Sequence, residues 1–576
     1  MKRLVYGLAI FGGLVLVSIL FMVLVGLLRQ PSIADGSVLR VRFAGPLPEA
    51  KTASLPSMLS DAAQPSLHEL TGAIRRAAED PKIVGLVLDV RSPELGLAQI
   101  EEIEAAVSDF RASGKWNTAF LETAGEFSRG DGAYALATLA DEVTLAPPGD
   151  VNLVGLEAQV PFLQNTLERL RIDAYVERRH EYKTAANTVT QESFTDSHAQ
   201  AIKTLIDTQQ QVLVSLIARN RDVEPDAVET WIEQGPHLAQ SAKKLGLVDA
   251  LGYWDSIREA AAAHTEREEP FVGVAEYLQT QQPTQGNDTI AFIIGSGMIV
   301  RGNSSGAPLS GQQLMASQTI ADAFRAARRA EVAGVLFRIS SGGGSYIASD
   351  VIRREVALTR EAGIPVVVSM GDVAASGGYF VAMDANKIVA QPGTLTGSIG
   401  VYAGMFAMRD FFERWLGITF DSYQATEMAD VFSSLDPPDA AAREKLAGML
   451  DRVYEDFVTK VAKARSLPLE NMDSVARGRV WSGQTAKTKG LVDRLGGMAI
   501  ALDELKKLAD IDLETPVSLQ LFPQPKSFLQ LVAESLTGQG LSLSTPLKRA
   551  ATQLQRAVTR PTEQALALPP GLRPEL

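Results

Sequence analysis

The chain has 576 residues, of which 46% are hydrophobic and 21% are charged, and this balance excludes a wholly disordered, collagen-like or coiled-coil protein. Its formal net charge of −13 argues against a general nucleic-acid binder. Cysteine is absent, which excludes disulfides, a cysteine nucleophile and thiolate metal sites. The last of the five histidines is His264, so a nucleophile in the C-terminal half must find a base of another residue type.

The chain begins with an apolar segment. Residues 4–28 carry no charge, and as a helix rising about 1.5 Å per residue they would span roughly 37 Å, enough to cross a bilayer. Lys2 and Arg3 precede the segment, which favours a cytoplasmic N-terminus with the bulk of the chain exported. A cleaved signal peptide is the alternative, but its apolar region is normally shorter and ends at a small-x-small site. We therefore predict an uncleaved, single-pass membrane anchor over residues 1–30.

The rest of the sequence is internally repeated. Residues 82–92 (KIVGLVLDVRS) correspond to residues 331–341 (EVAGVLFRISS), and each is a buried-strand pattern that follows an Ala-rich amphipathic helix. Further matches follow in the same order at an offset of roughly 245 residues, ending with GLVDALG from Gly246 and GLVDRLG from Gly490. Ordered matches at a nearly constant offset predict one α/β fold used twice. Two unrelated α/β domains of similar periodicity are the alternative.

These matches divide the chain into segments. We predict a first α/β repeat over residues 36–265 and a second over residues 287–511. The polar stretch between them, residues 266–286, is expected to be a linker. Residues 512–576 have no recognised counterpart in the first repeat and contain several prolines, so we expect an accessory C-terminal tail.

Gly-rich segments in the second repeat are the candidates for chemistry. SSGGGS at residues 340–345 and GDVAASGGY at residues 371–379 each follow a buried strand, and TGSIG follows at residues 396–400. Small residues let the backbone turn sharply and bring its N–H groups close to a bound atom. Ser376 would begin a helix, where free N–H groups favour an oxyanion. A simple turn, a helix cap and a phosphate cradle are the alternatives, although neither GxxxxGK[ST] nor GxGxxG is present.

Comparison of the repeats singles out two residues. The first repeat has Asp131 where the second has Ser376, and it also lacks the glycine cradle. It has Lys183 instead, for which the second repeat offers only Met428 or the neighbouring Ala429. Each copy has therefore kept one member of a Ser/Lys pair, which is a known combination of nucleophile and base. A solvated surface lysine is the ordinary alternative for Lys183.

The segment GDVAASGGYFVAMDANKIVAQPGTLTGSIGV at residues 371–401, with YKTA at residues 182–185, resembles the signal peptide peptidase A family, also called protease IV, in its long tandem-repeat form. The resemblance implies an α/β fold in which Clp protease–crotonase-like ββα spiral domains are repeated in tandem behind one N-terminal transmembrane helix. It implies that Ser376 is the nucleophile and Lys183 the general base.

The same resemblance assigns four further residues. Ser398 is implied to orient the lysine ammonium, and backbone N–H groups of Gly377, Gly343 and Gly344 are implied to form the oxyanion hole. The family commonly has Asn/Asp-Ser-Pro-Gly-Gly where this chain has SSGGG. That departure leaves open which loop glycine donates.

The resemblance also implies a function, namely a membrane-anchored serine endopeptidase that hydrolyses short apolar peptides such as cleaved signal peptides. It implies the bacterial inner membrane, a periplasmic catalytic body, and a homo-oligomer with a tetramer as the candidate size. We expect no cofactor, no metal and no nucleic acid. A lysine whose pKa is ordinarily about 10.4 must be buried to act as a base, so we expect its Nζ within about 3 Å of Ser376 Oγ.

Two other functions stay open at this point. One is a crotonase-like acyl-CoA enzyme, in which a similar cradle would hold a thioester enolate. The other is a non-catalytic membrane scaffold on a peptidase fold. His180 and Glu181 are expected to be bystanders, and the remaining candidates, His198 and His237, lack paired ligands at metal spacing and are expected to be structural.

Overall fold

The computed structural model describes residues 32–50, 64–265, 267–281, 286–303 and 313–523. The predicted anchor over residues 1–30 and residues 524–576 of the expected tail lie outside these ranges. Within the described ranges, no helix combines the length and apolar character that a membrane crossing needs.

The first repeat is built on a six-stranded sheet in the order β8-β4-β3-β2-β1-β9. Every neighbouring pair in it is parallel, as expected where helices cross over between successive strands. The crossover helices are α3 (Leu67–Glu79), α4 (Leu97–Ala112) and α5 (Asp131–Ala137). The strands are β1 (Ser37–Pro46), β2 (Ile83–Glu94), β3 (Trp116–Leu121), β4 (Val143–Leu145), β8 (Ala250–Leu251) and β9 (Phe271–Gly273).

The second repeat is built on an eight-stranded sheet with the path β18-β16-β14-β13-β10-β20, to which β15 and β19 add beside β14. Only β18 runs antiparallel to its neighbour there. The crossover helices are α13 (Ser317–Arg329), α14 (Tyr346–Glu361) and α15 (Gly377–Ala382). The strands are β10 (Asp288–Ser296), β13 (Gly334–Ser341), β14 (Val366–Ala375), β15 (Lys387–Ala390), β16 (Leu395–Gly397), β18 (Val480–Ser482), β19 (Arg494–Leu495) and β20 (Val517–Phe522).

The two halves share more than their order of elements. Tyr134 of α5 donates its hydroxyl proton to the carbonyl of Leu247 (2.8 Å), and Tyr379 of α15 does the same to Leu491 (2.9 Å). All four residues are fully buried, and each pair joins the short helix after the third strand to the GLVD segment. A buried tyrosine hydroxyl needs a partner, and both repeats supply it at the same place.

Helix α3 shows how these crossover helices form. Ser66 and Glu69 make a capping box at its start, which satisfies N–H groups that the first turn leaves free. Ala73, Ile74 and Ala77 then recur at helical spacing and are fully buried against the sheet. Small side chains on this face let the helix pack close to the strands.

Two short strands lie outside the predicted repeat boundaries. β9 comes from the segment expected to be a linker, and it pairs with β1 at the edge of the first sheet. β20 comes from the start of the expected tail, and it pairs with β10 at the matching edge of the second sheet. β9 has three residues, too few to show a side-chain periodicity, whereas β20 does alternate apolar and polar residues over VSLQL within the segment expected to be a tail.

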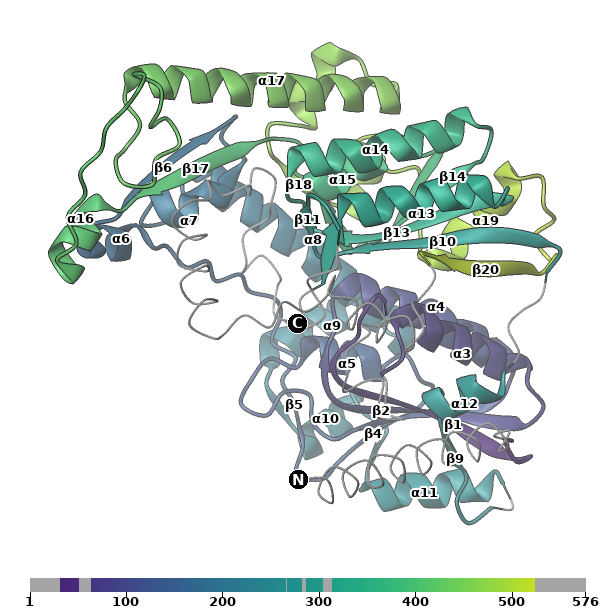
Figure 1. Cartoon of the computed structure of the whole chain (residues 1–576). Helices are drawn as coiled ribbons and strands as arrows, with labels where there is room; N and C mark the ends of the chain where they lie inside the picture. The colour runs from purple at the N-terminus through teal and green to yellow at the C-terminus, as the bar shows by residue number, and fades with distance from the viewer. Residues whose placement is uncertain (1–31, 51–63, 266, 282–285, 304–312, 524–576) are drawn as a thin grey trace, which may run out of the picture.

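The two repeats are also joined by a pair of strands, one from each half of the chain. β6 (Asp173–Arg178) belongs to the first half of the chain, yet it pairs antiparallel with β17 (Tyr402–Ala407) of the second half. Figure 1 shows this pair reaching away from both sheets, near the long helices α8 (Asp196–Arg221) and α17 (Ala440–Arg465). The segment after β6 therefore enters the second repeat.

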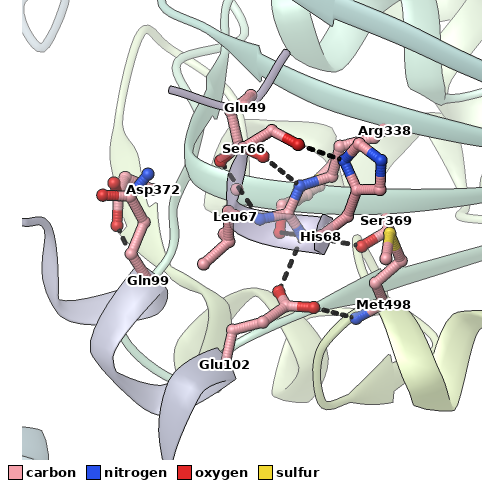
Figure 2. Close-up of polar contacts among 12 residues, drawn as sticks. Glu49, Ser66, Leu67, His68, Gln99, Glu102, Arg338, Ser369, Asp372 and Met498 are labelled. Carbon is pink, nitrogen blue, oxygen red and sulfur yellow. Dashed lines mark hydrogen bonds and ion pairs between the residues drawn. The ribbon is translucent and has the colours of Figure 1, made fainter. Parts of the chain in front are cut away.

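A buried arginine also ties the halves together. Arg338 of β13 is 2% exposed and donates to carboxylates of two first-repeat residues, Glu49 (2.9 Å) and Glu102 (2.9 Å), as Figure 2 shows. It donates as well to Ser369 Oγ (2.9 Å) on β14. Because a buried charge that loses its partner costs about 3–5 kcal/mol, this cluster opposes separation of the two sheets.

The remaining elements are short. They are β5 (Asp150–Val151) paired with β7 (His237–Leu238), β11 (Met298–Val300) paired with β12 (Leu314–Ala316), and the helices α6 (Gln164–Leu170), α7 (Asn187–Thr190), α9 (Pro225–Gln234), α10 (Ala239–Leu245), α11 (Trp254–Ala263), α12 (Val274–Thr280), α16 (Arg409–Phe411), α18 (Gly483–Thr488) and α19 (Met498–Leu508).

Candidate active site

Ser376 lies in the sharp turn between β14 and α15. Its φ of 55° and ψ of −117° are unusual for a residue with a side chain and cost of order 1–3 kcal/mol. The turn is held by the Ser376 N–H, which donates to the carbonyl of Gly397 (2.8 Å). Ser376 is fully buried, and in this described part of the chain its hydroxyl makes no capping hydrogen bond to α15. The strained turn therefore presents the hydroxyl for another role.

That hydroxyl meets Lys183. Lys183 Nζ lies 2.9 Å from Ser376 Oγ, 3.0 Å from Ser398 Oγ and 3.0 Å from the Ser398 carbonyl oxygen. These three contacts use the three hydrogen-bond directions of the amine, and all go to oxygens of serine residues. The separation between Nζ and Oγ is within the hydrogen-bond distance that the sequence led us to expect, and the pair forms within one chain.

The lysine is buried rather than solvated. Its exposed fraction is 2%, and desolvation lowers the pKa of its amine to about 7. Burial penalises the charged ammonium, and no neighbouring carboxylate is among the causes of the shift that would offset it. Near neutral pH a large share of Lys183 is therefore neutral and able to accept a proton.

Two glycines make room for the lysine. A Cβ on Gly478 would lie 2.4 Å from Lys183 N, and one on Gly400 would lie 3.3 Å from Lys183 Cδ. Gly478 also has a φ of +85°, which side chains rarely tolerate. Four residues before Lys183, Arg179 N donates to the Val401 carbonyl (2.9 Å), which continues the pairing of β6 with β17.

Ser398 is held as firmly as Ser376. It has a φ of 52°, it is 2% exposed, and its N–H donates to the Arg479 carbonyl (2.6 Å). The strand before it, β16, pairs with β14, and Thr396 Oγ1 donates to the Ala374 carbonyl (2.7 Å). The two serines thus directly follow the ends of adjacent strands, and Lys183 Nζ lies between them.

The glycine loop after β13 packs against the start of α15. Gly343 and Gly344 have φ values of +105° and +153°, which favour glycine. A Cβ on Gly377 would lie 3.1 Å from both Gly343 Cα and Gly344 N, so the two backbone segments touch. Gly343 already donates its N–H to Ser341 Oγ (3.1 Å). The geometry therefore favours Gly344 and Gly377 as the pair of donors to a bound atom.

The two residues expected to be bystanders of the chemistry have partners of their own. Glu181 forms an ion pair with Arg477 (3.0 Å), and the His180 ring lies 4.6 Å from the ring of Tyr454. Both partners belong to the second repeat and are distant in sequence, so a single sequence offers no signal that would find them. The expectation that neither residue takes part in the chemistry stays a prediction.

The other histidines have structural surroundings. His237 Nε2 lies 2.7 Å from the Trp231 carbonyl oxygen. His198 is buried between the rings of Phe162 and Phe194, and burial lowers its pKa to about 4. Over the described ranges, no group of three or more His, Asp or Glu side chains could hold a metal ion.

The first repeat has a different arrangement at the place of Ser376. Asp131 is fully buried at the start of α5, and its Oδ1 accepts the N–H groups of Val154 (3.0 Å) and Gly155 (2.7 Å). Burial raises the pKa of this carboxyl. Asp131 therefore ties a helix start to the neighbouring loop.

Comparison with known proteins gives consistent results. The sequence profile described as peptidase family S49 matches residues 123–268 and 359–512. The chain is 31% identical to Protease 4 of Salmonella typhi, over 82% of this chain and 76% of that protein. It is 29% identical to Protease 4 of Haemophilus influenzae, over 78% and 74% of the two chains. It is 30% identical to the chloroplastic serine protease SPPA of Arabidopsis thaliana, over 90% and 76%.

Solved structures show a weaker likeness. ClpP1 from Listeria monocytogenes aligns with 36% of this chain and 91% of its own chain, at 16% identity and a TM-score of 0.23. At that score the specific relation to Clp protease and crotonase spirals stays a prediction, whereas the mixed α/β fold is directly described by the two sheets.

Proposed function

Because the chain belongs to peptidase family S49 and is of the protease IV type, we propose that it is a membrane-anchored serine endopeptidase with Ser376 as nucleophile and Lys183 as general base. The observation that carries this proposal is the 2.9 Å contact between Lys183 Nζ and Ser376 Oγ inside a desolvated site. A helix cap or a solvated lysine would need neither the contact nor the burial.

The first chemical step follows from the lysine environment. Neutral Lys183 accepts the hydroxyl proton of Ser376 as Oγ attacks the peptide carbonyl. The ammonium that forms then donates to the carbonyl and the hydroxyl of Ser398, both already 3.0 Å away. Ser398 thereby stabilises the charged lysine at the moment when the charge appears, without any rearrangement.

The oxyanion is stabilised by backbone donors. The proposed donors are the N–H groups of Gly377, directly after Ser376, and of Gly344, whose N would lie 3.1 Å from a Cβ on Gly377. Each such donor contributes about 10²–10³-fold to the rate in comparable sites. Lys183 then protonates the leaving amine, and a water molecule activated by the same lysine hydrolyses the acyl-enzyme.

The substrate class and the location extend the proposal. We propose short apolar peptides, such as cleaved signal peptides, as substrates, with residues 4–28 tethering the body to the bacterial inner membrane and the body on the periplasmic side. An active site that is tethered beside the bilayer would encounter apolar peptides that have been released into that bilayer. The full-length protein should stay with membranes during alkaline extraction, whereas a variant without residues 1–30 should not. This variant should still hydrolyse soluble peptides.

The proposed assembly is a homo-oligomer, with a tetramer as the candidate size. Trp415, Leu416 and Ile418 support it, because they are 56%, 56% and 45% exposed within a few residues of one another. Clustered exposed apolar side chains are typical of contact surfaces. Light scattering on the purified protein should give a mass of several chains, and Trp415→Ser should reduce it.

A serine-reactive fluorophosphonate and a fluorogenic apolar peptide together test the proposed chemistry. We expect one labelled site, at Ser376, and loss of both labelling and hydrolysis in Ser376→Ala. Hydrolysis at the normal rate by Ser376→Ala would overturn the nucleophile assignment. Failure of the assembled wild-type protein to label would favour the non-catalytic scaffold, and turnover of enoyl-CoA esters would favour the crotonase-like alternative.

A further inference from the structure

The four residues before Lys183 all contact the second repeat. Arg179 donates to the Ala447 carbonyl (2.6 Å), the His180 ring lies 4.6 Å from that of Tyr454, Glu181 pairs with Arg477 (3.0 Å), and Arg479 lies 3.8 Å above the Tyr182 ring. Such a continuous run of contacts fixes the direction in which the next residue enters the site. Two of the four partners come from one turn, residues 477–479.

This turn also touches the lysine and its serine partner. Gly478 packs directly on the Lys183 backbone, where a Cβ would lie 2.4 Å from N. Gly478 N donates to the Ile399 carbonyl (2.8 Å), and the Arg479 carbonyl accepts the N–H of Ser398 (2.6 Å). The 477–479 turn therefore lies between the main chain of the lysine and the segment that carries Ser398.

The backbone of the turn is shaped for this place. Arg477 and Gly478 have consecutive φ values of 60° and +85°, so the chain reverses within two residues. An arginine in that conformation is strained, and the surrounding contacts of the turn maintain it. Strain that is held at a site usually has a role there.

We propose that the 477–479 turn is a positioning device for the general base, which holds Lys183 so that its Nζ stays between Ser376 and Ser398. The proposal rests on the proposed function, in which Lys183 is that base. Gly478 provides the space, Arg477 anchors Glu181, and Arg479 anchors Tyr182. The turn acts through the lysine backbone and leaves the reacting atoms to other residues.

The physical reason is the length of the lysine side chain. Its flexible four-carbon stem can place Nζ in many positions, so the location of the main chain decides whether the amine reaches both serines. A shift of about 1 Å can cost about 10²-fold in rate. The same shift would admit water and relieve the desolvation that keeps the amine neutral. Loss of positioning should therefore lower kcat and also move the acid limb of the pH profile upward.

The experiment compares Gly478→Ala, Arg477→Gln and Glu181→Gln in the full-length protein, with peptide hydrolysis followed from pH 5 to 9. We expect Gly478→Ala to lower kcat about 100-fold, with KM nearly unchanged and the acid limb shifted to higher pH. Arg477→Gln and Glu181→Gln should each cost about fivefold. The double variant should cost no more than Arg477→Gln alone, because that change already removes the pair with Glu181 together with the pair to Asp473 (3.4 Å).

Matched controls separate positioning from general damage. Arg258→Gln removes an exposed ion pair with Glu269 of the same 3.0 Å length, far from the site in the first repeat, and should leave the pH profile unchanged. The exchanged pair Glu181→Arg with Arg477→Glu should recover most of the activity. If Gly478→Ala does not fold, the Arg477 and Glu181 variants decide the question.

Two outcomes are distinguishable. If Arg477→Gln and Glu181→Gln fold and show the kcat and acid limb of the Arg258→Gln control, the positioning proposal is wrong. If Lys183→Ala, assayed beside them, hydrolyses peptide at the normal rate, the proposed function is wrong instead. An upward shift of the acid limb with an unchanged KM supports both.

Discussion

Asp131 in the first repeat and Ser376 in the second correspond in the comparison of the two sequences, and both lie at the start of a short buried helix. Asp131 is the first residue of α5, and Ser376 directly precedes α15. In the first repeat a carboxylate oxygen accepts two loop N–H groups. In the second, a hydroxyl contacts a lysine brought from the other repeat. Both helix starts therefore carry a buried polar side chain, and the two differ in the partner that reaches it.

The loop after the second strand differs in the same way. In the first repeat β2 continues to Glu94, and Leu95 fills the space before α4 with 8% of its surface exposed. In the second repeat β13 ends at Ser341, and the loop has two glycines of positive φ, Gly343 and Gly344, in place of the packed leucine side chain. One copy fills the loop with an apolar side chain, and the other forms it from glycine backbone packed against the start of α15.

The largest difference between the two repeats is expected at the proposed nucleophile. Ser376→Ala should lower peptide hydrolysis by about four orders of magnitude or more, because no other group replaces Oγ. The measurement is kcat/KM with a fluorogenic apolar peptide. Asp131→Ser, the matched change in the first repeat, should create no second labelled serine because no lysine reaches it. Labelling at residue 131 would show that the start of α5 can activate a serine without Lys183.

The second largest effect concerns the base. Lys183→Arg should keep a cation of similar reach and yet lower kcat/KM by about 10³-fold, because a guanidinium does not lose its proton in proteins. Circular dichroism should show a folded protein. Activity within tenfold of the wild type would mean that the cation, rather than proton transfer, is what the site uses.

The glycine loop comes next. Gly344→Ala should lower kcat by about 100-fold, because a Cβ there would lie 2.2 Å from the Ile299 carbonyl oxygen and displace a proposed oxyanion donor. Leu95→Ala at the corresponding place should affect thermal stability and leave kcat unchanged. Equal losses of kcat in the two variants would contradict the assignment of the loop.

The pH profile sharpens the comparison further. In the proposed mechanism only the neutral lysine accepts the serine proton. Burial lowers its pKa to about 7, so kcat/KM should fall about tenfold per unit below pH 7 and level off above it. Steady-state assays from pH 5 to 9 in constant ionic strength test this. A profile that is flat across pH 7 would mean that Lys183 does not titrate in the working range.

The smallest effect is expected in the first repeat. Asp131→Asn keeps an oxygen acceptor for the two N–H groups, and it mimics the neutral form that burial favours by raising the pKa of the carboxyl. Activity should stay within about twofold, and the free energy of unfolding should change by less than about 1 kcal/mol. A large loss of peptide hydrolysis would show that the first turn contributes to catalysis.

Much of the site could be predicted from the sequence because its signals are local. The Gly-rich turns follow buried strands, and the comparison of one repeat with the other singled out Ser376 and Lys183. The edge strands β9 and β20 were not predicted: β9 has three residues, and β20 was included in the expected tail despite its alternating pattern. The ion pair of Glu181 with Arg477 joins the two halves of the chain, so a single sequence gives no signal for it.

The sequence by itself determined the repeated α/β pattern and the two residues that each copy retained. The tertiary structure decided how residues of the two repeats surround the site. It placed Gly478 against the lysine backbone, packed both Gly343 and Gly344 against Gly377, and buried Arg338 between Glu49 and Glu102. Periodicity reports only neighbours along the chain, whereas these contacts depend on how two separately formed sheets pack.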